Sequence, residues 1–395
     1  MSGSSAAPPI RVGVLFSETG VTALVERTQR RAVELALEEL NAAGGVLGRS
    51  LEAVVYDPAS DPRKFRRLAE DLLGNDGVEV IFGCYMSSTR KAVLPVVEQR
   101  GGLLFYPTLY EGFEFSANCI YSGAAPNQNS IGLARYLMQN YGERFYLIGS
   151  NYVFPYESNR IIRDYISSHG GKVLEERYIP LSAGEEDIAP IIADIRKCNP
   201  SVIISTVVGE ATAAFYRAYR KAGFDPAVMP IGSLTTCEPE VAAIGAEAAE
   251  GHYTSAPYFQ SIRSPENERF VAAYQAKFGP DAPMSSCTEA AYFQVHLFAR
   301  AVERAGSAAI PDVKEALPGC LYVAPQGPVR IDRENNHTYL WPRIGRVAAS
   351  GQFDVVEESA VPIKPDPYLI TPEDETWAAG RSPDTKSTSI VGNGG

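Results

Sequence analysis

The sequence predicts an α/β protein built from two doubly wound lobes with parallel sheets. From Ile10 onward, short β-branched runs alternate with amphipathic helical runs, a pattern typical of repeated βα units. A second series of the same kind begins after the segment 122–126. The 395 residues, 45% of them apolar, exceed the length at which one core stops growing, so we expect two or three domains.

The first series contains four predicted strands and three predicted helices. Strand 10–16 ends in the turn 17–20, and the next helix, 26–41, places Val33, Leu37 and Leu40 on one face. The other elements of this series are strands 51–56, 78–82 and 103–106 and helices 64–73 and 90–99.

The second series begins with a helix and continues as βα units. Its predicted helices are 130–140, 157–168, 188–197, 210–222 and 238–244, and its predicted strands are 145–149, 172–179, 202–206, 228–233 and 251–255.

After Pro257 the pattern changes. Two longer helices, 265–278 and 286–305, and a short one from Asp312 have no sheet of their own, so we expect them to cover the first lobe. The strands predicted after them, at 319–323, 329–331 and 343–347, suggest hairpins. The chain therefore crosses between the lobes more than once.

We accordingly assign the lobes to discontinuous segments. The first lobe comprises residues 10–122 and 254–332, and the second comprises 123–253 and 333–370. Residues 1–9 are expected to be flexible, as is the tail 371–395, which is rich in Gly, Ser, Thr, Pro and charge.

Composition argues against several classes of function. A net charge of −11 and a pI near 5.1 disfavour direct binding to nucleic acid or to an anionic membrane. The start of the chain lacks the pattern of a signal peptide, and no run approaches a ~20-residue membrane span. We therefore expect a cytoplasmic protein, or a periplasmic one if a signal peptide has been removed.

Cysteine and histidine spacing gives no sign of a metal or cofactor. The six cysteines form no CxxC pair, which fits buried thiols in a reducing compartment, and the four histidines form no HExxH arrangement. We predict neither a metal nor a cofactor.

The segment Phe82 to Ser88 is the most informative stretch. It predicts a buried strand, a tight turn at Gly83, and a helix whose first turn opens on Ser87 and Ser88. A serine hydroxyl at a helix start can receive a carbonyl or carboxylate oxygen, and Tyr85 follows the carboxyl end of the strand, where open α/β sheets bind ligands. The same residues also suit an ordinary strand-to-helix connection with a serine cap.

Five motifs in register resemble the branched-chain amino-acid, urea and amide binding proteins, and most of all the amide sensors that regulate amidase operons. The motifs are 16–20, 83–87 with 90–93, 106–112, 123–129 and 325–330, within a likeness that runs from about Ile10 to Tyr368. The resemblance implies the type I periplasmic-binding-protein fold, in which three crossovers join two lobes that close on a ligand. The crossovers would fall near 122–124, 254 and 332.

The resemblance also implies a set of ligand-binding residues. Ser87 would hydrogen-bond the amide, with tyrosines as pocket walls and Phe154 where the amide sensors have a second tyrosine. The implied set is Tyr85, Ser87, Tyr106, Pro107, Thr108, Tyr152, Phe154, Val208 and Thr235. From the residues alone, each tyrosine also suits simple packing, and Thr235 and Thr236 also suit caps for the helix that follows.

Three functions are compatible with these features. The resemblance implies non-catalytic binding of a short-chain aliphatic amide or urea, with lobe closure signalling to a transcription antiterminator. The alternative is the substrate receptor of an ABC importer for urea, amides or branched-chain amino acids; an amino acid would need a carboxylate near the pocket, and Glu111, Glu157 and Glu238 are candidates. A cysteine amidase using Cys84 lacks an identifiable base, so we predict no enzyme. A homo-oligomer is left open.

Overall fold

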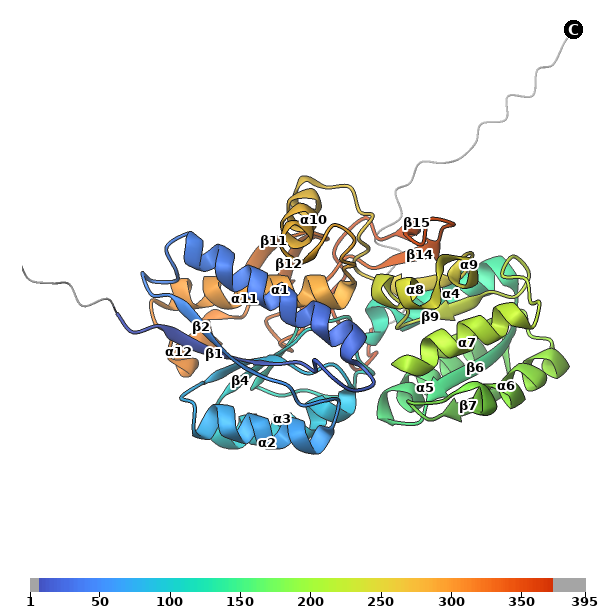
Figure 1. Cartoon of the computed structure of the whole chain (residues 1–395), viewed down its shortest axis with the longest axis horizontal. Helices are drawn as coiled ribbons and strands as arrows, with labels where there is room; N and C mark the ends of the chain where they lie inside the picture. The colour runs from blue at the N-terminus through green and yellow to red at the C-terminus, as the bar shows by residue number, and fades with distance from the viewer. Residues whose placement is uncertain (1–6, 372–395) are drawn as a thin grey trace, which may run out of the picture.

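A computed structural model describes residues 7–371 and divides them into two lobes, each around its own sheet (Figure 1). The first sheet is parallel throughout, in the order β2-β1-β3-β4-β5. Its strands are β1 (Ile10–Leu15), β2 (Leu51–Tyr56), β3 (Val80–Gly83), β4 (Leu103–Tyr106) and β5 (Cys119–Tyr121). This confirms the predicted parallel α/β architecture of the first lobe.

Helices cover both faces of the first sheet. On one face, α2 (Pro62–Gly74) packs against α3 (Ser87–Arg100), around a core that includes Phe65, Leu72 and Val97. On the other face lies α1 (Ala23–Ala42).

The second sheet has seven strands, in the order β15-β14-β10-β9-β8-β6-β7. Five are parallel: β6 (Arg144–Ser150), β7 (Lys172–Ile179), β8 (Val202–Thr206), β9 (Ile231–Ser233) and β10 (Tyr253–Ala256). The helices of this lobe are α4 (Ser130–Tyr141), α5 (Val153–Ser168), α6 (Glu185–Cys198), α7 (Glu210–Lys221), α8 (Glu238–Ile244) and α9 (Ala246–Ala249). A short 3-10 helix, Pro126–Gln128, leads into α4.

The second sheet is parallel over five strands and ends at one edge in an antiparallel hairpin. The strands β14 (Arg343–Val347) and β15 (Phe353–Glu358) form an antiparallel hairpin, and β14 pairs with β10. The sequence predicted β14 but not β15. The acidic residues of β15 are typical of an exposed segment.

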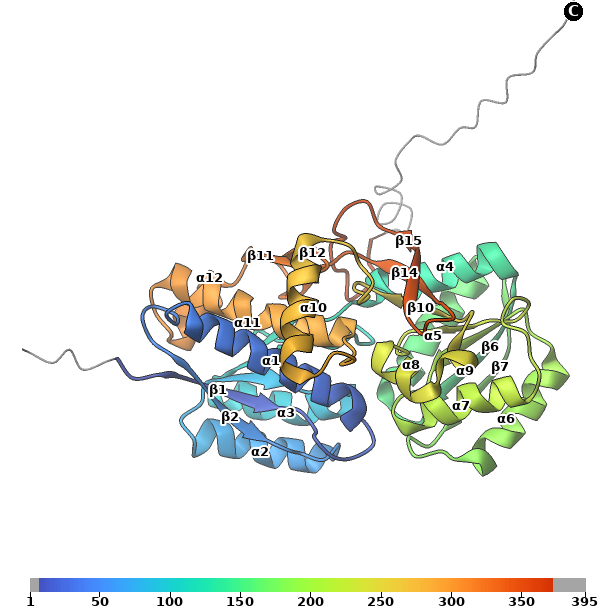
Figure 2. The ribbon, with the colours of Figure 1, turned by 45° about the horizontal axis from the view of Figure 1, so that its top comes forward.

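The helices without a sheet of their own pack where they were expected. In Figures 1 and 2, α10 (Pro265–Phe278) and α11 (Ser286–Ala305) lie beside α1, and α11 packs along α1 in one apolar core. The helix α12 (Ile310–Ala316) follows. A small antiparallel sheet of β11 (Leu321–Ala324), β12 (Gly327–Ile331) and β13 (Thr338–Tyr339) completes this region.

The chain passes between the lobes after β5, after β10 and after β13, close to the three expected crossovers. The exact lobe boundaries stay a prediction; β10, placed near a boundary, belongs to the second sheet. The lobes also touch away from the crossovers, at α1 with α8 and at α3 with α5.

The expected flexible ends fall mostly outside the described residues. Within them, Pro8 and Pro9 accept hydrogen bonds from Arg49. Among residues 7–371, no helix combines the length and the apolar character that crossing a bilayer requires.

Candidate functional site

The turn after β3 is built by close backbone packing. A Cβ on Gly83 would lie 2.6 Å from the carbonyl oxygen of Leu15, so only glycine fits there. The next residue, Cys84, has a φ of 71°, in the left-handed region that disfavours non-glycine residues. The turn thus holds a strained backbone directly before Tyr85.

The start of α3 differs from the prediction. The helix begins at Ser87 itself, and Met86 occupies the N-cap position without a side-chain hydrogen bond to the helix. The expectation that Ser87 or Ser88 caps this helix is therefore wrong. The Ser87 hydroxyl has other partners, which leave it no role as a cap.

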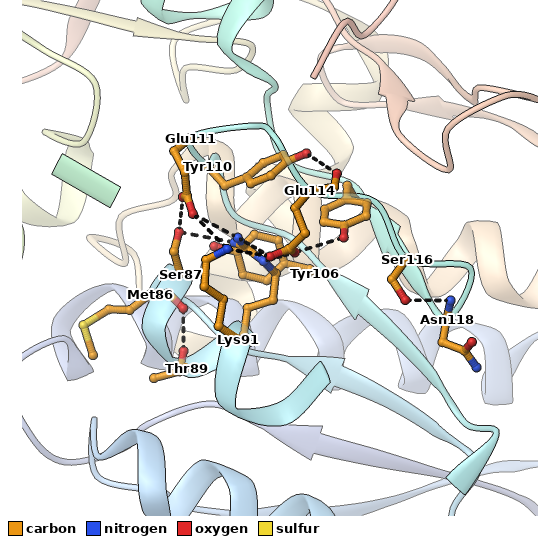
Figure 3. A network of polar contacts seen from close by, with 12 residues as sticks. Met86, Ser87, Thr89, Lys91, Tyr106, Tyr110, Glu111, Glu114, Ser116 and Asn118 are labelled. Atoms are coloured by element: carbon orange, nitrogen blue, oxygen red, sulfur yellow. Dashed lines mark hydrogen bonds and ion pairs between the residues drawn. The ribbon is translucent and has the colours of Figure 1, made fainter. Parts of the chain in front are cut away.

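Ser87 is 2% exposed and is held by two charged side chains (Figure 3). Its Oγ donates to Glu111 Oε2 at 2.5 Å and accepts from Arg90 Nη1 at 3.3 Å. Glu111 lies in the loop after β4, so the loop and the helix meet at this hydroxyl.

Arg90 is the centre of this cluster and is fully buried. Its Nε donates to Glu114 Oε1 at 2.7 Å and its Nη2 to Glu111 Oε1 at 3.3 Å. The guanidinium also lies 4.6 Å from the ring centroids of both Tyr106 and Tyr110. A planar fork that pairs with carboxylates and stacks on aromatic rings is a geometry that arginine provides and lysine does not.

The cluster has a marked effect on Glu114. Burial would raise the pKa of its carboxyl, but the charges of Arg90 and Lys91 lower it to about 2. Lys91 Nζ lies 2.8 Å from Glu114 Oε2 and 3.6 Å from Glu111 Oε1. Glu114 is therefore ionised at neutral pH.

A chain of aromatic groups connects this cluster to the third crossover. The Tyr110 hydroxyl and His337 Nε2 lie 2.5 Å apart, and the His337 ring stacks on Tyr121 with 4.2 Å between centroids. Burial lowers the pKa of His337 to about 4, so its imidazole is neutral. Thr338, at the start of β13, donates to the carbonyl of Tyr121.

The predicted residues at the end of β4 and just after it have different neighbours. The Tyr106 hydroxyl donates to the carbonyl of Tyr85 at 2.7 Å, so it supports Tyr85 from below. Thr108 Oγ1 accepts from Gln29 Nε2 at 3.1 Å, and Gln29 Oε1 is buried without a hydrogen-bond partner. Pro107 lines a separate narrow pocket at the crossovers, together with Leu234 and Cys287.

The second lobe brings its predicted residues to the carboxyl ends of its strands. Tyr152 and Phe154 follow β6, Val208 follows β8, and Thr235 follows β9. Phe154 and Val208 share one apolar cluster with Tyr85 and Met86, with Tyr152 packed against it.

Burial raises the pKa of Tyr152 well above its usual range, and the charge of Glu111 raises it further. The two lobes therefore meet at Tyr85 and Tyr152.

The capping alternative for the threonines does not hold. The N-cap of α8 is Cys237, with no side-chain cap from a threonine. Thr235 Oγ1 instead donates to the carbonyl of Val207 at 2.8 Å.

A cavity of about 250 Å³ opens between the lobes. The first lobe contributes Tyr85 and the start of α1, and the second contributes the start of α7 and part of α8. The lining residues are Val21, Thr22, Leu24, Val25, Tyr85, Gly209, Glu210, Thr212, Ala213, Arg217, Glu240 and Ala243. Among them, Tyr85 is the one predicted site residue.

Glu240 is a buried carboxyl group of this cavity that sequence reasoning missed. Its carboxyl accepts from Cys237 N at 3.2 Å and from Thr212 Oγ1 at 3.4 Å. Burial raises its pKa to about 8, although both hydrogen bonds act in the opposite direction. At neutral pH it is mostly a neutral acid, and its position in the first turn of α8 beside Glu238 was the only available signal.

The three carboxylates that the sequence offered as partners for a ligand ammonium are bound to groups of the protein itself. Glu111 holds Ser87 and Arg90, Glu157 pairs with Arg160 at 2.8 Å, and Glu238 accepts from Gln260 N at 2.7 Å.

Nucleophilic chemistry at Cys84 finds no support. Burial raises the pKa of this thiol well above its usual range, which disfavours the thiolate. Among the described residues there is no group of three or more potential metal ligands.

Two lobes joined by three crossings, with a ligand-sized cavity between them, define a two-lobed binding protein. Residues 10–374 match the family described as "Periplasmic binding protein domain". The chain therefore belongs to the periplasmic binding protein family.

Two of the similar curated proteins are described as amino-acid binding proteins. The chain is 25% identical over 347 residues, 85% of its own length and 89% of the relative's, to the leucine-, isoleucine-, valine-, threonine- and alanine-binding protein of Pseudomonas aeruginosa. It is 24% identical over 284 residues, 70% of its own length, to the Leu/Ile/Val/Thr-binding protein of Salmonella typhimurium, 75% of which is covered.

Solved structures show the same fold. A solute binding protein of an ABC transporter from Rhodopseudomonas palustris HaA2, in complex with p-hydroxybenzoic acid, aligns with a TM-score of 0.84 at 23% identity, covering 92% of this chain and all of that one. A leucine binding protein from Thermotoga maritima aligns with a TM-score of 0.77 at 19% identity, covering 88% of this chain and 98% of that one. The type I periplasmic-binding-protein fold expected from the motifs is confirmed.

Proposed function

We propose that this protein is a non-catalytic receptor that closes its two lobes on a small uncharged ligand with N–H donors, such as a short-chain aliphatic amide or urea, and presents it to an ABC-type importer. We prefer the importer role, which follows the transporter-linked relatives, to the sensor role that the motifs led us to expect. It also implies a periplasmic location in place of the expected cytoplasmic one.

The observation that carries the choice of ligand is the full engagement of Arg90. Glu111 and Glu114 both pair with it, and the two tyrosine rings cover its faces. A ligand carboxylate placed beside Ser87 would approach two carboxylates whose cation is already taken. Burying such a charge without a partner is far more costly than burying an amide.

The remaining polar groups suit an amide. Gln29 Oε1 is a buried acceptor without a partner, close to Thr108, and Glu240 across the cavity is an uncharged acid near pH 7. An amide offers two donors and one acceptor, and each group left unpaired on burial would cost ~1–3 kcal/mol. The cavity beside Tyr85, which is lined by apolar residues such as Val21 and Leu24, leaves space for a short acyl chain.

An amino acid is the competing ligand. Its ammonium could take the proton's place at Glu240, which would then ionise and pair with it. Relatives that bind leucine, isoleucine and valine make this a concrete alternative. An amino acid carries a carboxylate that the site must accommodate, whereas an amide or urea does not.

Titration calorimetry with acetamide, butyramide, urea and leucine tests the proposal. We expect an amide or urea to bind, with Ser87→Ala losing most of that affinity. Ser88→Ala is the matched control, because Ser88 is only partly buried and neighbours Ser87 in the same helical turn. Binding of leucine alone would contradict the amide assignment, and silence from all four would contradict the receptor role for these ligands.

A second candidate function is the amide sensor that signals to a transcription antiterminator. The five motifs in register favour it, together with the tyrosines at the lobe contact. Purification with the products of neighbouring genes separates the two roles. A ligand-dependent complex with an RNA-binding antiterminator supports the sensor, and one with a membrane permease supports the importer.

A further inference from the structure

The Ser87 hydroxyl has a fixed hydrogen-bond direction. A serine hydroxyl carries one proton and two acceptor lone pairs. The proton goes to Glu111 Oε2 at 2.5 Å, and one lone pair receives Arg90 Nη1 at 3.3 Å. What remains for a ligand is a single lone pair, which can only accept.

The Ser87 hydroxyl, which donates to Glu111, cannot easily donate elsewhere. Glu111 is 3% exposed, and its other oxygen is held by Arg90 Nη2 at 3.3 Å with Lys91 Nζ at 3.6 Å. The ion pairs with Arg90 and Lys91 make the Glu111 carboxylate a hydrogen-bond acceptor, so the hydrogen bond between the two side chains runs from serine to glutamate. A ligand carbonyl that sought the serine proton would have to displace a charge-assisted hydrogen bond.

This pair lies at the contact between the lobes. The helix α3, which begins at Ser87, contacts α5 of the second lobe, and Phe154 of α5 packs in one cluster with Tyr85. Figure 3 shows the Ser87 and Glu111 side chains pointing toward each other, joined by a dashed line.

We infer that Glu111 is a specificity-determining residue: by holding the Ser87 proton, it makes the serine an obligate acceptor that selects ligands with an N–H group and rejects the matching carboxylates. The inference rests on the proposed function, because it concerns the same binding site and states that the ligand donates and Ser87 accepts. It holds for the amide nitrogen of an amide and equally for the ammonium of an amino acid.

The test compares two pairs of matched probes, acetamide with acetate and leucine with 4-methylpentanoate, by titration calorimetry on the full chain. In the unchanged protein the N–H ligand of at least one pair should bind about 100-fold or more tightly than its carboxylate partner, which lacks that N–H group. In Glu111→Gln, Arg90 draws the new amide oxygen, so the new NH₂ faces Ser87 and frees the serine proton. The preference should then fall to about tenfold or less.

Glu114→Gln is the matched control. Glu114 also pairs with Arg90, at 2.7 Å, and has no hydrogen bond to Ser87. Its substitution removes the same unit of charge from the cluster, and the preference for N–H ligands should stay within about threefold of the original. A purely structural role of Glu111 would weaken both members of a probe pair alike and leave their ratio unchanged.

The outcomes separate the inference from the proposed function. Glu111→Gln with an unchanged ratio, or an original protein that prefers the carboxylates, overturns the inference while a receptor remains. Failure of every probe to bind the folded original overturns both. Should Glu111→Gln not fold, Ser87→Ala decides: loss of affinity for the N–H ligand but not for its partner supports the inference, and equal loss overturns it.

Discussion

The two lobes bury acidic side chains at their contact in opposite ways. In the first lobe, Glu111 and Glu114 surround Arg90 and form a closed ionic cluster, with the pKa of Glu114 at about 2. In the second lobe, Glu240 accepts only from the uncharged donors Cys237 and Thr212, and its pKa rises to about 8. The ionic cluster of the first lobe is thus fixed in charge, whereas Glu240, which lines the cavity, can titrate.

The difference shows how the carboxylates of each lobe can interact with a ligand. A paired carboxylate in a low-dielectric setting keeps its charge and its geometry, so it can orient a neighbouring hydroxyl. A buried acid without a cation keeps its proton instead, and it stays able to donate, accept, or pair with an incoming ammonium. The ionic cluster around Arg90 would supply specificity for neutral ligands. Glu240 would allow a positively charged ligand group to bind.

The largest effect should come from breaking the ionic cluster. Arg90→Met removes the buried cation of Glu111 and Glu114 and leaves them the partly exposed Lys91, which we expect to lower the free energy of unfolding by ~3–5 kcal/mol. Arg160→Met is the control, since Arg160 pairs with Glu157 and Asp164 at the surface and should cost under ~1 kcal/mol. Urea unfolding of both variants measures the difference, and similar losses would contradict the comparison.

The second effect is a loss of stability toward high pH. Burial raises the pKa of Glu26 to about 7 and of Glu238, Glu240 and Glu289 to about 8. Because these groups keep their protons when folded and lose them near pH 4.5 when unfolded, their stabilising contribution is complete below pH 4.5 and is lost as the pH rises through 7 to 8. Thermal unfolding should therefore show a falling midpoint between pH 5 and 9.

Glu240→Gln isolates one of these groups. The amide keeps the shape of the protonated acid, so we expect little change near pH 5 and a variant more stable than the original by ~3 kcal/mol near pH 9. Glu114→Gln should show no such gain, because the pKa of Glu114 is lowered. Parallel pH slopes for the original and Glu240→Gln would show that Glu240 is ionised in the folded protein.

The same variant gives a smaller effect on binding. If the ligand is an amide, Glu240→Gln should leave its affinity within about threefold, since an uncharged acid and an amide are similar partners. If an ammonium pairs with Glu240, the affinity should fall by about 100-fold or more. Calorimetry with acetamide and leucine on both proteins distinguishes the two.

The smallest effect concerns a contact between the lobes. The Arg160 guanidinium of α5 lies 5.1 Å from the ring of Phe113, which belongs to the first lobe. At this exposed site the contact is worth ~0.5–1 kcal/mol, so Phe113→Ala should weaken ligand binding about two- to fivefold. Phe115→Ala, at a similarly exposed ring nearby, is the control and should leave binding unchanged.

Much of the fold could be predicted because apolar runs end at clear turn residues. Strands at 51–56, 103–106, 172–179 and 202–206 and helices at 265–278 and 286–305 have the predicted bounds. The helix predicted to start at Glu157 begins at Val153 instead, because Pro155 is tolerated in a first turn. The strands β5, β13 and β15 were missed, since their strand character depends on distant partners.

The candidate site was less predictable for the same reason. The motifs placed Tyr85, Phe154 and Val208 in one contact region, which the structure supports. The partner of Ser87, however, comes from 24 residues further along in an irregular loop, and Glu240 reaches the cavity from the other lobe. Pairings across such distances are set by tertiary packing, which no local pattern records.

A crystal structure of the protein grown with butyramide tests the central claim most directly. The account predicts the amide between the lobes beside Tyr85, with its NH₂ within hydrogen-bond distance of Ser87 Oγ and the bond from Ser87 to Glu111 intact. An amide oxygen at Ser87 with Glu111 turned away, or a ligand bound outside the cleft, would contradict it.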